Sequence, residues 1–150
     1  MADPFMMLRQ DHQKVKQLFS EFESTTDTTG KWRIAHEAIE ELDIHAAIEE
    51  QIFYPAVSRS LGEMGETVME AEEEHHVVHF LVDELRNMDA NDPHFDAKFK
   101  VLAENVRHHI DEEESQMLPK AQQLDQAQLQ QLGDQMTELK QTMKQEMHQA

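Results

Sequence analysis

Two stretches of the sequence carry a histidine followed four residues later by a glutamate. The first pair is His45 and Glu49, and the second is His109 and Glu113. Residues four apart lie on one face of an α-helix, so each pair would direct an imidazole and a carboxylate toward one point. The chain has no cysteine, and imidazole with carboxylate but without thiolate suits iron, manganese or zinc. The pattern therefore indicates a metal site.

The two pairs belong to an internal repeat. Residues 44–50 align with residues 108–114 without a gap, and a proline follows the histidine by ten residues in both copies, as Pro55 and Pro119. Upstream, His12 precedes the first pair by 33 residues, and His75 precedes the second by 34. Such self-similarity predicts two helix pairs related by a pseudo-two-fold axis.

The same spacing predicts that the candidate residues meet at one height. In an antiparallel helix pair, a residue near the start of one helix lies level with a residue near the end of the next. His12 and His45 satisfy this relation, as do His75 and His109. A single histidine on a helix seam is more often an ordinary core residue. Buried carboxylates, however, cost several kcal/mol each unless a cation compensates, so the combined set of four histidines with Glu49 and Glu113 favours metal binding.

The remaining histidines are weaker candidates. His79 lies one helical turn after His75 and is expected either as a seventh metal ligand or as a seam histidine packed above the site. His76 and His108 are each rotated about 100° from the seam, which favours positions at its boundary. The five-residue step from His108 to Glu113 leaves His108 as a competing ligand.

These residues require helices to position them, and apolar residues at three-to-four spacing predict five. Four long amphipathic helices joined by short links indicate an all-α, antiparallel up-down-up-down four-helix bundle over residues 1–120. A C-terminal amphipathic helix in residues 121–150 should pack on or beside the bundle, since a methionine stripe usually serves packing. The expected spans are a first helix starting at Asp3-Pro4, Lys31–Tyr54 ending at Pro55, Glu66–Met88, a fourth helix starting at Asp92-Pro93 and ending near Pro119, and Asp125–Met147.

Charge and hydropathy narrow the function classes. The formal net charge is −18 with histidine neutral, which opposes binding to nucleic acid or anionic lipid. No stretch has the length of a membrane span, and residues 1–8 lack the basic and apolar regions of a signal peptide. We therefore expect a cytoplasmic protein that contacts neither nucleic acid nor membrane.

The quoted motifs resemble the hemerythrin family, specifically the bacterial HHE cation-binding domains. The resemblance covers about residues 5–120, and it implies two iron ions with a bridging oxo or hydroxo group. His12, His45, His75 and His109 would be terminal ligands, and Glu49 and Glu113 would bridge the irons. In oxygen-carrying hemerythrins the third helix has His-x-x-x-His, which His75 and His79 match, whereas the fourth has His-x-x-x-x-Asp, which this chain replaces by His109-x-x-x-Glu113. That departure favours HHE proteins that handle oxygen, nitric oxide, peroxide or iron.

The working hypothesis is a non-haem di-iron protein that binds O2, or a related ligand such as NO or peroxide, in sensing, storage or stress response. An apolar pocket would receive the ligand, with candidate lining residues Ile48, Val78, Phe80, Val82 and Ile110. One alternative is a di-iron enzyme that metabolises peroxide or NO with a reductase partner. Another is a metal-stabilised interaction module. A ferritin-type centre is a poor match, because only Glu72 and His75 form the Glu-x-x-His pair that it needs.

Overall fold

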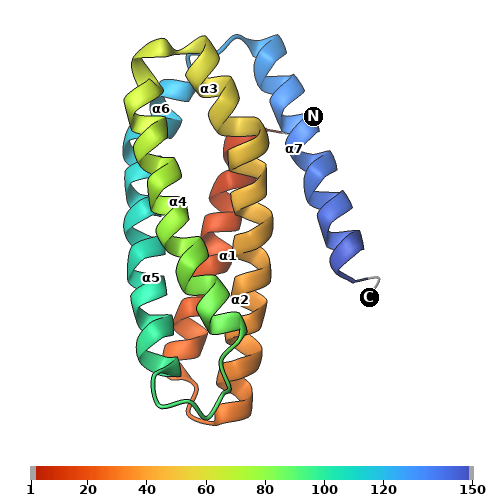
Figure 1. Ribbon diagram of the computed structural model, residues 1–150. Coiled ribbons are helices and arrows are strands. Elements are labelled where there is room, and N and C mark those ends of the chain that lie inside the picture. Colours follow the sequence, from red (N-terminus) through yellow and green to blue (C-terminus); the bar gives the residue numbers. More distant parts are fainter. Residues whose placement is uncertain (1–2, 149–150) are drawn as a thin grey trace.

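The computed structural model describes residues 3–148, and every long element in that range is a helix. Residues 1–2 and 149–150 lie outside the described residues. The predicted regions 1–120 and 121–150 each include one of these pairs at their outer end. Four long helices run alternately up and down as a bundle (Figure 1), which confirms the predicted all-α architecture. The four helices are α1 (Pro4–Ser24), α2 (Thr28–Ile48), α4 (Gly65–Arg86) and α5 (Phe95–Glu112).

Aspartate side chains begin several of these helices. The Asp3 carboxylate accepts hydrogen bonds from the backbone N–H groups of Phe5 and Met6, while Pro4 occupies the first turn, where no N–H partner is needed. This confirms the predicted start of the first helix. The fourth helix begins later than Asp92-Pro93 predicts, at Phe95, because the residues from Asp92 first close a turn whose Asp92 carbonyl accepts from the N–H of Phe95.

The second and fourth helices continue through their prolines. After α2 the chain forms a π-helical turn, η1 (Glu49–Phe53), and then α3 (Tyr54–Ser60). After α5 it forms η3 (Glu113–Met117) and then α6 (Leu118–Ala121). The expectation that the second helix ends at Pro55 was therefore wrong. Pro55 lies in the first turn of a new helical segment, a position that tolerates a residue without N–H.

Each π-turn starts at the glutamate of a His-x-x-x-Glu pair. The backbone N–H of Tyr54 bonds to the carbonyl of Glu49, five residues back, and the N–H of Leu118 bonds to the carbonyl of Glu113 in the same way. Such turns insert one extra residue into a helix and are frequent at functional sites. Here both are placed where the repeat predicts metal ligands.

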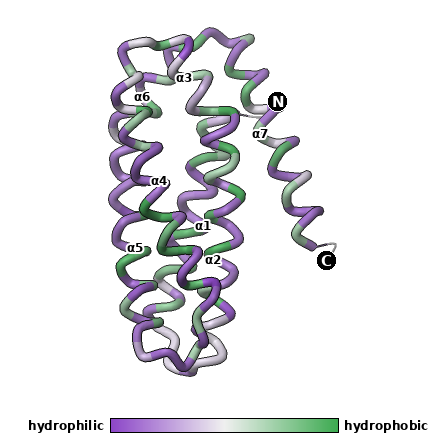
Figure 2. Tube along the Cα trace, viewed as in Figure 1, coloured by the Kyte–Doolittle hydropathy of each residue, from purple (hydrophilic) through white to green (hydrophobic). Residues whose placement is uncertain are grey.

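The bundle core is divided into two apolar layers with polar residues between them. We call the layer near α3 and α6 the upper layer and the layer near the opposite end the lower layer (Figure 1). Figure 2 shows hydrophobic and hydrophilic residues alternating along each helix, as expected when one face of each helix is buried. Phe53 and Leu118 lie in the upper layer, and Phe19 and Phe99 in the lower one, all fully buried.

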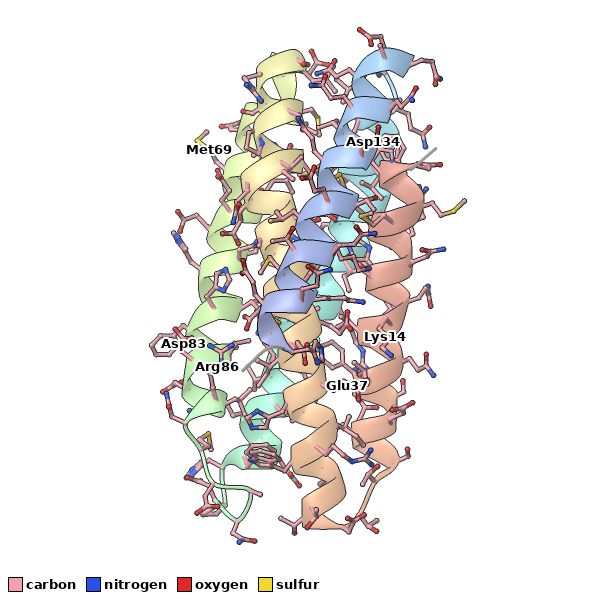
Figure 3. The ribbon with its side chains drawn as sticks, turned by 90° about the vertical axis from the view of Figure 1, so that its right-hand side faces the viewer. Lys14, Glu37, Met69, Asp83, Arg86 and Asp134 are labelled. Atoms are coloured by element: carbon pink, nitrogen blue, oxygen red, sulfur yellow. The ribbon has the colours of Figure 1, made fainter. Side chains whose placement is uncertain are left out.

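A further helix, α7 (Gln126–Met147), follows the bundle. It lies over the seam between α1 and α2, in front of both in Figure 3, and packs on each of them. Leu132 and Met136 are buried and extend the upper layer. The described helices include none with the length and apolar character needed to cross a membrane.

Candidate metal centre

Six of the seven predicted ligands converge between the two apolar layers. His12, His45, Glu49, His75, His109 and Glu113 are all at most 8% exposed. His12 and His75 come from α1 and α4. The two His-x-x-x-Glu pairs come from the junctions of α2 with η1 and of α5 with η3. We call this set the inner six.

The first group within the inner six is His12, His45, Glu49 and Glu113. The Nε2 atom of His12 lies 3.2 Å from Oε1 of Glu113, and Nε2 of His45 lies 3.3 Å from Oε1 of Glu49. Each of the four residues also presents a buried polar atom that has no hydrogen-bond partner among the described residues: Nε2 of both histidines, Oε2 of Glu49 and Oε1 of Glu113. Four orphaned buried atoms in one place are costly unless something binds them.

The spacing of these atoms suits a metal ion. Ligand atoms at about 2.0–2.2 Å from an ion lie roughly 3 Å apart when their bonds are at right angles. The nitrogen–oxygen distances of 3.2 and 3.3 Å between His12 and Glu113 and between His45 and Glu49 match that value. The donor set of two imidazoles and two carboxylates also fits a divalent cation of the iron, manganese or zinc type. The residues present therefore fit the predicted metal.

The second group is centred on His75 and His109. Their Nε2 atoms lie 3.2 Å apart, and Nε2 of His75 lies 3.1 Å from Oε1 of Glu49. On the other side, Nε2 of His109 lies 3.3 Å from Oε2 of Glu113. Glu49 and Glu113 therefore face both groups, which is the arrangement that carboxylates bridging two ions require.

The Tyr54 hydroxyl lies at the middle of the second group. It donates toward the carboxylates of Glu113 at 2.6 Å and Glu49 at 3.1 Å, and it lies 3.2 Å from Nε2 of His75 and 3.1 Å from Nε2 of His109. Burial, together with the two carboxylates, raises the pKa of the Tyr54 phenol well above its usual value. Tyr54 is thus a seventh polar residue of the centre.

The sequence pattern did not reveal Tyr54. On a regular α-helix, five residues turn the chain by about 500°, which would place Tyr54 about 140° away from Glu49 around the axis. The π-turn from Glu49 to Phe53 widens this turn and brings the tyrosine back to the seam. The available signal was a tyrosine directly before the repeated proline, Pro55, at a point where the second copy has Leu118.

Each of the four inner histidines has its Nδ1 atom in contact with one further carboxylate. We call these four residues the outer carboxylates. The Nδ1–oxygen distances are 3.0 Å for Asp11 and His45, 2.7 Å for Glu50 and His75, 2.6 Å for Glu74 and His109, and 2.6 Å for Glu114 and His12. Each outer carboxylate precedes or follows an inner ligand on its own helix but supports a histidine on a neighbouring helix. The four contacts therefore close a ring around the bundle. Carboxylates in this position fix the tautomer and orientation of metal-binding histidines.

The seventh predicted ligand, His79, lies outside the inner six. Its Nε2 is 2.9 Å from Oε2 of Glu50, and its side chain is 39% exposed. With His75 and Glu50 it forms a separate, partly exposed group. His108 lies farther out still, since its side chain is 68% exposed and its Nε2 is 3.0 Å from Glu112.

Three of the inner histidines, His45, His75 and His109, have raised pKa values when no metal is bound. Burial opposes the imidazolium form, but neighbouring carboxylates outweigh it. The charge of Glu49 raises the pKa of His45 to about 10, and a hydrogen bond to Glu49 raises that of His75 to about 9. A hydrogen bond to Glu113 raises the pKa of His109 to about 11. Although burial raises it, the pKa of Glu49 is held well below its usual range by His45 and the other partners.

Two outer carboxylates also remain ionised. Burial raises the pKa of Asp11, yet hydrogen bonds and charges from His45 and Lys140 bring it below its usual value. The pKa of Glu50 is lowered chiefly by its hydrogen bond to His75. Asp11 and Glu50 can thus act as acceptors for imidazole N–H groups.

A cavity of about 40 Å³ adjoins the imidazoles on the side of the lower layer. A water molecule needs roughly 10–15 Å³ of such space, so the cavity has room for a diatomic molecule or a peroxide. Val78, Val82 and Ile110 line it, as predicted. Phe80 was predicted wrongly, because it lies off the seam and is 64% exposed, and Ile48 packs in the upper layer instead.

Comparison with known proteins gives a family match over most of the chain. Residues 3–121 match the family model described as hemerythrin HHE cation binding domain. A crystal structure of an HHE cation binding domain-containing protein from Mycobacterium kansasii has a TM-score of 0.81 and 24% identity, and the likeness covers 95% of this chain and 88% of that one. The structural likeness bears on the fold.

Two curated relatives are similar over 73% of the chain. One is an uncharacterized hemerythrin-like protein of Schizosaccharomyces pombe, 31% identical over 110 residues, which cover 54% of that protein. The other, from a Nostoc species, is named a DNA nickase and is 30% identical over 109 residues, which cover 30% of its length. The chain thus spans about half or less of these longer proteins, and their names describe them alone.

Proposed function

Because the chain belongs to the hemerythrin HHE cation-binding domain family, we propose that it is a non-haem di-iron protein that binds O2, NO or peroxide between its helices. The observation that carries this proposal is the convergence of four unpartnered, buried ligand atoms from His12, His45, Glu49 and Glu113. Buried polar atoms without partners carry a desolvation cost that a bound cation would offset.

The two ions would occupy the two groups of the centre. His12 and His45 would hold one ion, and His75 and His109 the other, with Glu49 and Glu113 shared between them. Two shared carboxylates with four imidazoles suit a dinuclear centre better than a single zinc ion. The outer carboxylates would keep each imidazole Nδ1 protonated, so that Nε2 faces the metal.

Tyr54 would complete the second position. Its hydroxyl already lies within 3.2 Å of a ligand atom from each of Glu49, Glu113, His75 and His109. We propose that a metal at this position takes the Tyr54 oxygen as a ligand after its proton is lost. His79 would then remain outside the coordination sphere and hold Glu50.

A ferrous pair, when bound, would supply electrons and an open position for a small ligand. The chain's part is to shape the space beside it. The cavity of about 40 Å³ has mainly apolar walls, contributed by residues such as Val15, Leu42 and Val106. Such walls exclude bulk water and admit small, weakly polar molecules. The net charge of −18 also favours a small neutral ligand over a nucleic-acid partner.

Elemental analysis of protein purified without added metal tests the proposal first. About two irons per chain, followed by NO binding to the anaerobically reduced protein, is the expected result. One equivalent of zinc, or no bound metal, would contradict it. Steady-state consumption of NO or hydrogen peroxide with a reductant would instead identify the enzyme that the sequence leaves as an alternative.

A further inference from the structure

Helix α7 places a lysine side chain against an outer carboxylate of the metal centre. The Nζ atom of Lys140 lies 2.6 Å from Oδ1 of Asp11, whose side chain is only 5% exposed. The other oxygen of Asp11, Oδ2, lies 3.0 Å from Nδ1 of His45, and Nε2 of His45 lies 3.3 Å from Glu49. A continuous chain of polar contacts therefore runs from α7 to a bridging carboxylate.

The other half of the repeat has no such lysine. Glu74, the counterpart of Asp11, accepts from Nδ1 of His109 at 2.6 Å, and no described lysine or arginine lies within 4.0 Å of its carboxylate. The helix face beside it is open, with His108 68% exposed. In the first half, the residue that corresponds to His108 is Ile44. Ile44 is only 1% exposed and lies in the upper layer, which Leu132 and Met136 of α7 extend. Helix α7 thus makes the two halves of the repeat chemically different.

The physical role of Lys140 follows from the burial of Asp11. A carboxylate removed from water needs its hydrogen bonds and an opposite charge to keep one orientation. Lys140 supplies both to Oδ1 and leaves Oδ2 aimed at His45. Loss of a carboxylate that orients a metal-binding histidine typically weakens metal binding about 10–100-fold, and Lys140 acts one contact farther out, through Asp11.

We propose that Lys140 is a positioning residue for the metal held by His12 and His45, and that it couples the docking of α7 to metal binding there. This inference rests on the proposed metal function but reaches beyond the family match, which ends at residue 121. Coupling of this kind is reciprocal, because a helix that tightens metal binding must itself be stabilised by the metal.

Metal titration of the full-length chain tests the role of the lysine. We would compare Lys140→Met and Lys140→Gln, which remove the charge, with Lys140→Arg, which keeps it, and with Lys144→Met, which removes an exposed lysine one turn along α7. The probes are anaerobic Fe2+, followed by binding isotherms, and Co2+, followed by its visible d–d spectrum. We expect one of two binding steps to weaken in both charge-removing variants, by up to about tenfold, the lower end of the range for direct partners of metal ligands, with a changed Co2+ spectrum. Lys140→Arg should restore most of the affinity.

Hydrogen exchange of α7 provides a second readout. In the wild type and in Lys144→Met, metal should slow exchange in residues 126–147, whereas in Lys140→Gln it should not. Two metals bound with wild-type affinity by Lys140→Met and Lys140→Gln would overturn the inference while leaving the proposed function intact. Failure of Lys140→Arg to rescue would also overturn it, since packing rather than charge would then be responsible. A wild type that binds no metal would overturn the proposed function itself.

Discussion

Glu114 places its Oε2 atom 2.6 Å from Nδ1 of His12, although 102 positions separate the two residues in the sequence. Asp11, Glu50 and Glu74 make the corresponding contacts to the other three inner histidines. These contacts explain how flexible imidazoles reach one point from four helices. They also show that residues beside the ligands in sequence support ligands elsewhere in the bundle.

Removing Glu114 should weaken metal binding without touching a ligand. Glu114→Ala frees the His12 ring to rotate and removes the acceptor for its Nδ1–H, so we expect iron affinity to fall about 10–100-fold. Glu112→Ala is the matched control, because Glu112 pairs with the exposed His108 instead. Anaerobic Fe2+ titration measures the iron affinity of both variants. Equal affinities in the two variants would contradict the role given to the outer carboxylates.

Neighbouring histidines of α5 should behave differently when replaced. His109→Ala removes a buried candidate ligand and should cost the protein at least one of its two irons, whereas His108→Ala should retain both. Mass spectrometry of the purified variants measures their metal content and tests this expectation. If both variants keep the wild-type content, the assignment of His109 is wrong.

The Tyr54 hydroxyl should mark the second metal position spectroscopically. Tyr54 is the one tyrosine of the chain, so visible phenolate-to-iron(III) absorption can come from no other residue. Tyr54→Phe should abolish that absorption. It should also destabilise the metal-free protein by about 1–3 kcal/mol, because buried acceptors of Glu49 and Glu113 lose their donor. An unchanged spectrum of the oxidised protein would exclude Tyr54 as a ligand.

The metal-free protein should lose stability as the pH rises. The folded pKa values of His45, His75 and His109, about 10, 9 and 11, exceed the unfolded value of about 6.5. Their contribution to stability is therefore complete below about pH 6.5 and is lost as the pH rises through these folded values. A loss of 1 kcal/mol lowers the melting midpoint of a domain this size by about 2–4 °C, and we expect a fall of at least about 5 °C by pH 10.

Calorimetry or circular dichroism of metal-free and metal-loaded protein checks this pH dependence. The metal-loaded form should show a much smaller fall up to pH 10, because metal replaces the protons on the imidazoles. A flat midpoint between pH 6.5 and pH 10 in the metal-free protein would show that His45, His75 and His109 are not held protonated.

The cavity should limit which ligands reach the centre. Val78→Phe places a larger side chain at its wall, and we expect NO affinity of the ferrous protein to fall at least about tenfold while iron content stays unchanged. Val77→Phe adds the same volume one residue earlier, at an exposed position. Stopped-flow measurements of NO binding to the ferrous protein compare the two variants. Equal affinity in the two variants would place the ligand elsewhere.

Much of this architecture could be predicted because helical periodicity and the repeat act together. His45 with Glu49 and His109 with Glu113 share helix faces under ordinary helix geometry, so their convergence with His12 and His75 followed from spacing alone. The chain beyond Glu49 could not be predicted in this way. A π-turn has no recognisable residue signature, and it both carries the helix past Pro55 and turns Tyr54 inward.

The contacts between helices that support the metal-binding histidines could not be predicted from the sequence either. Sequence spacing indicates which residues share a face of one helix, whereas the partner of an imidazole on another helix depends on interhelical packing. The contact between Lys140 and Asp11 spans 129 positions and depends on how α7 crosses α1. The failure for Phe80 has a different origin, because Phe80 follows His75 by five residues and a regular helix already turns it about 140° away from that histidine.

The ring of outer carboxylates has a consequence for how the two halves of the repeat depend on each other. Glu50 of the first half orients His75 of the second, and Glu114 of the second orients His12 of the first. These crossed contacts are reciprocal, as in an interface between two identical subunits related by a two-fold axis. Neither helix pair therefore contains everything needed to orient its own histidines, and a substitution of Glu50 or Glu114 acts first on a histidine of the other half. Both halves of the repeat are therefore needed to orient the histidines of the centre.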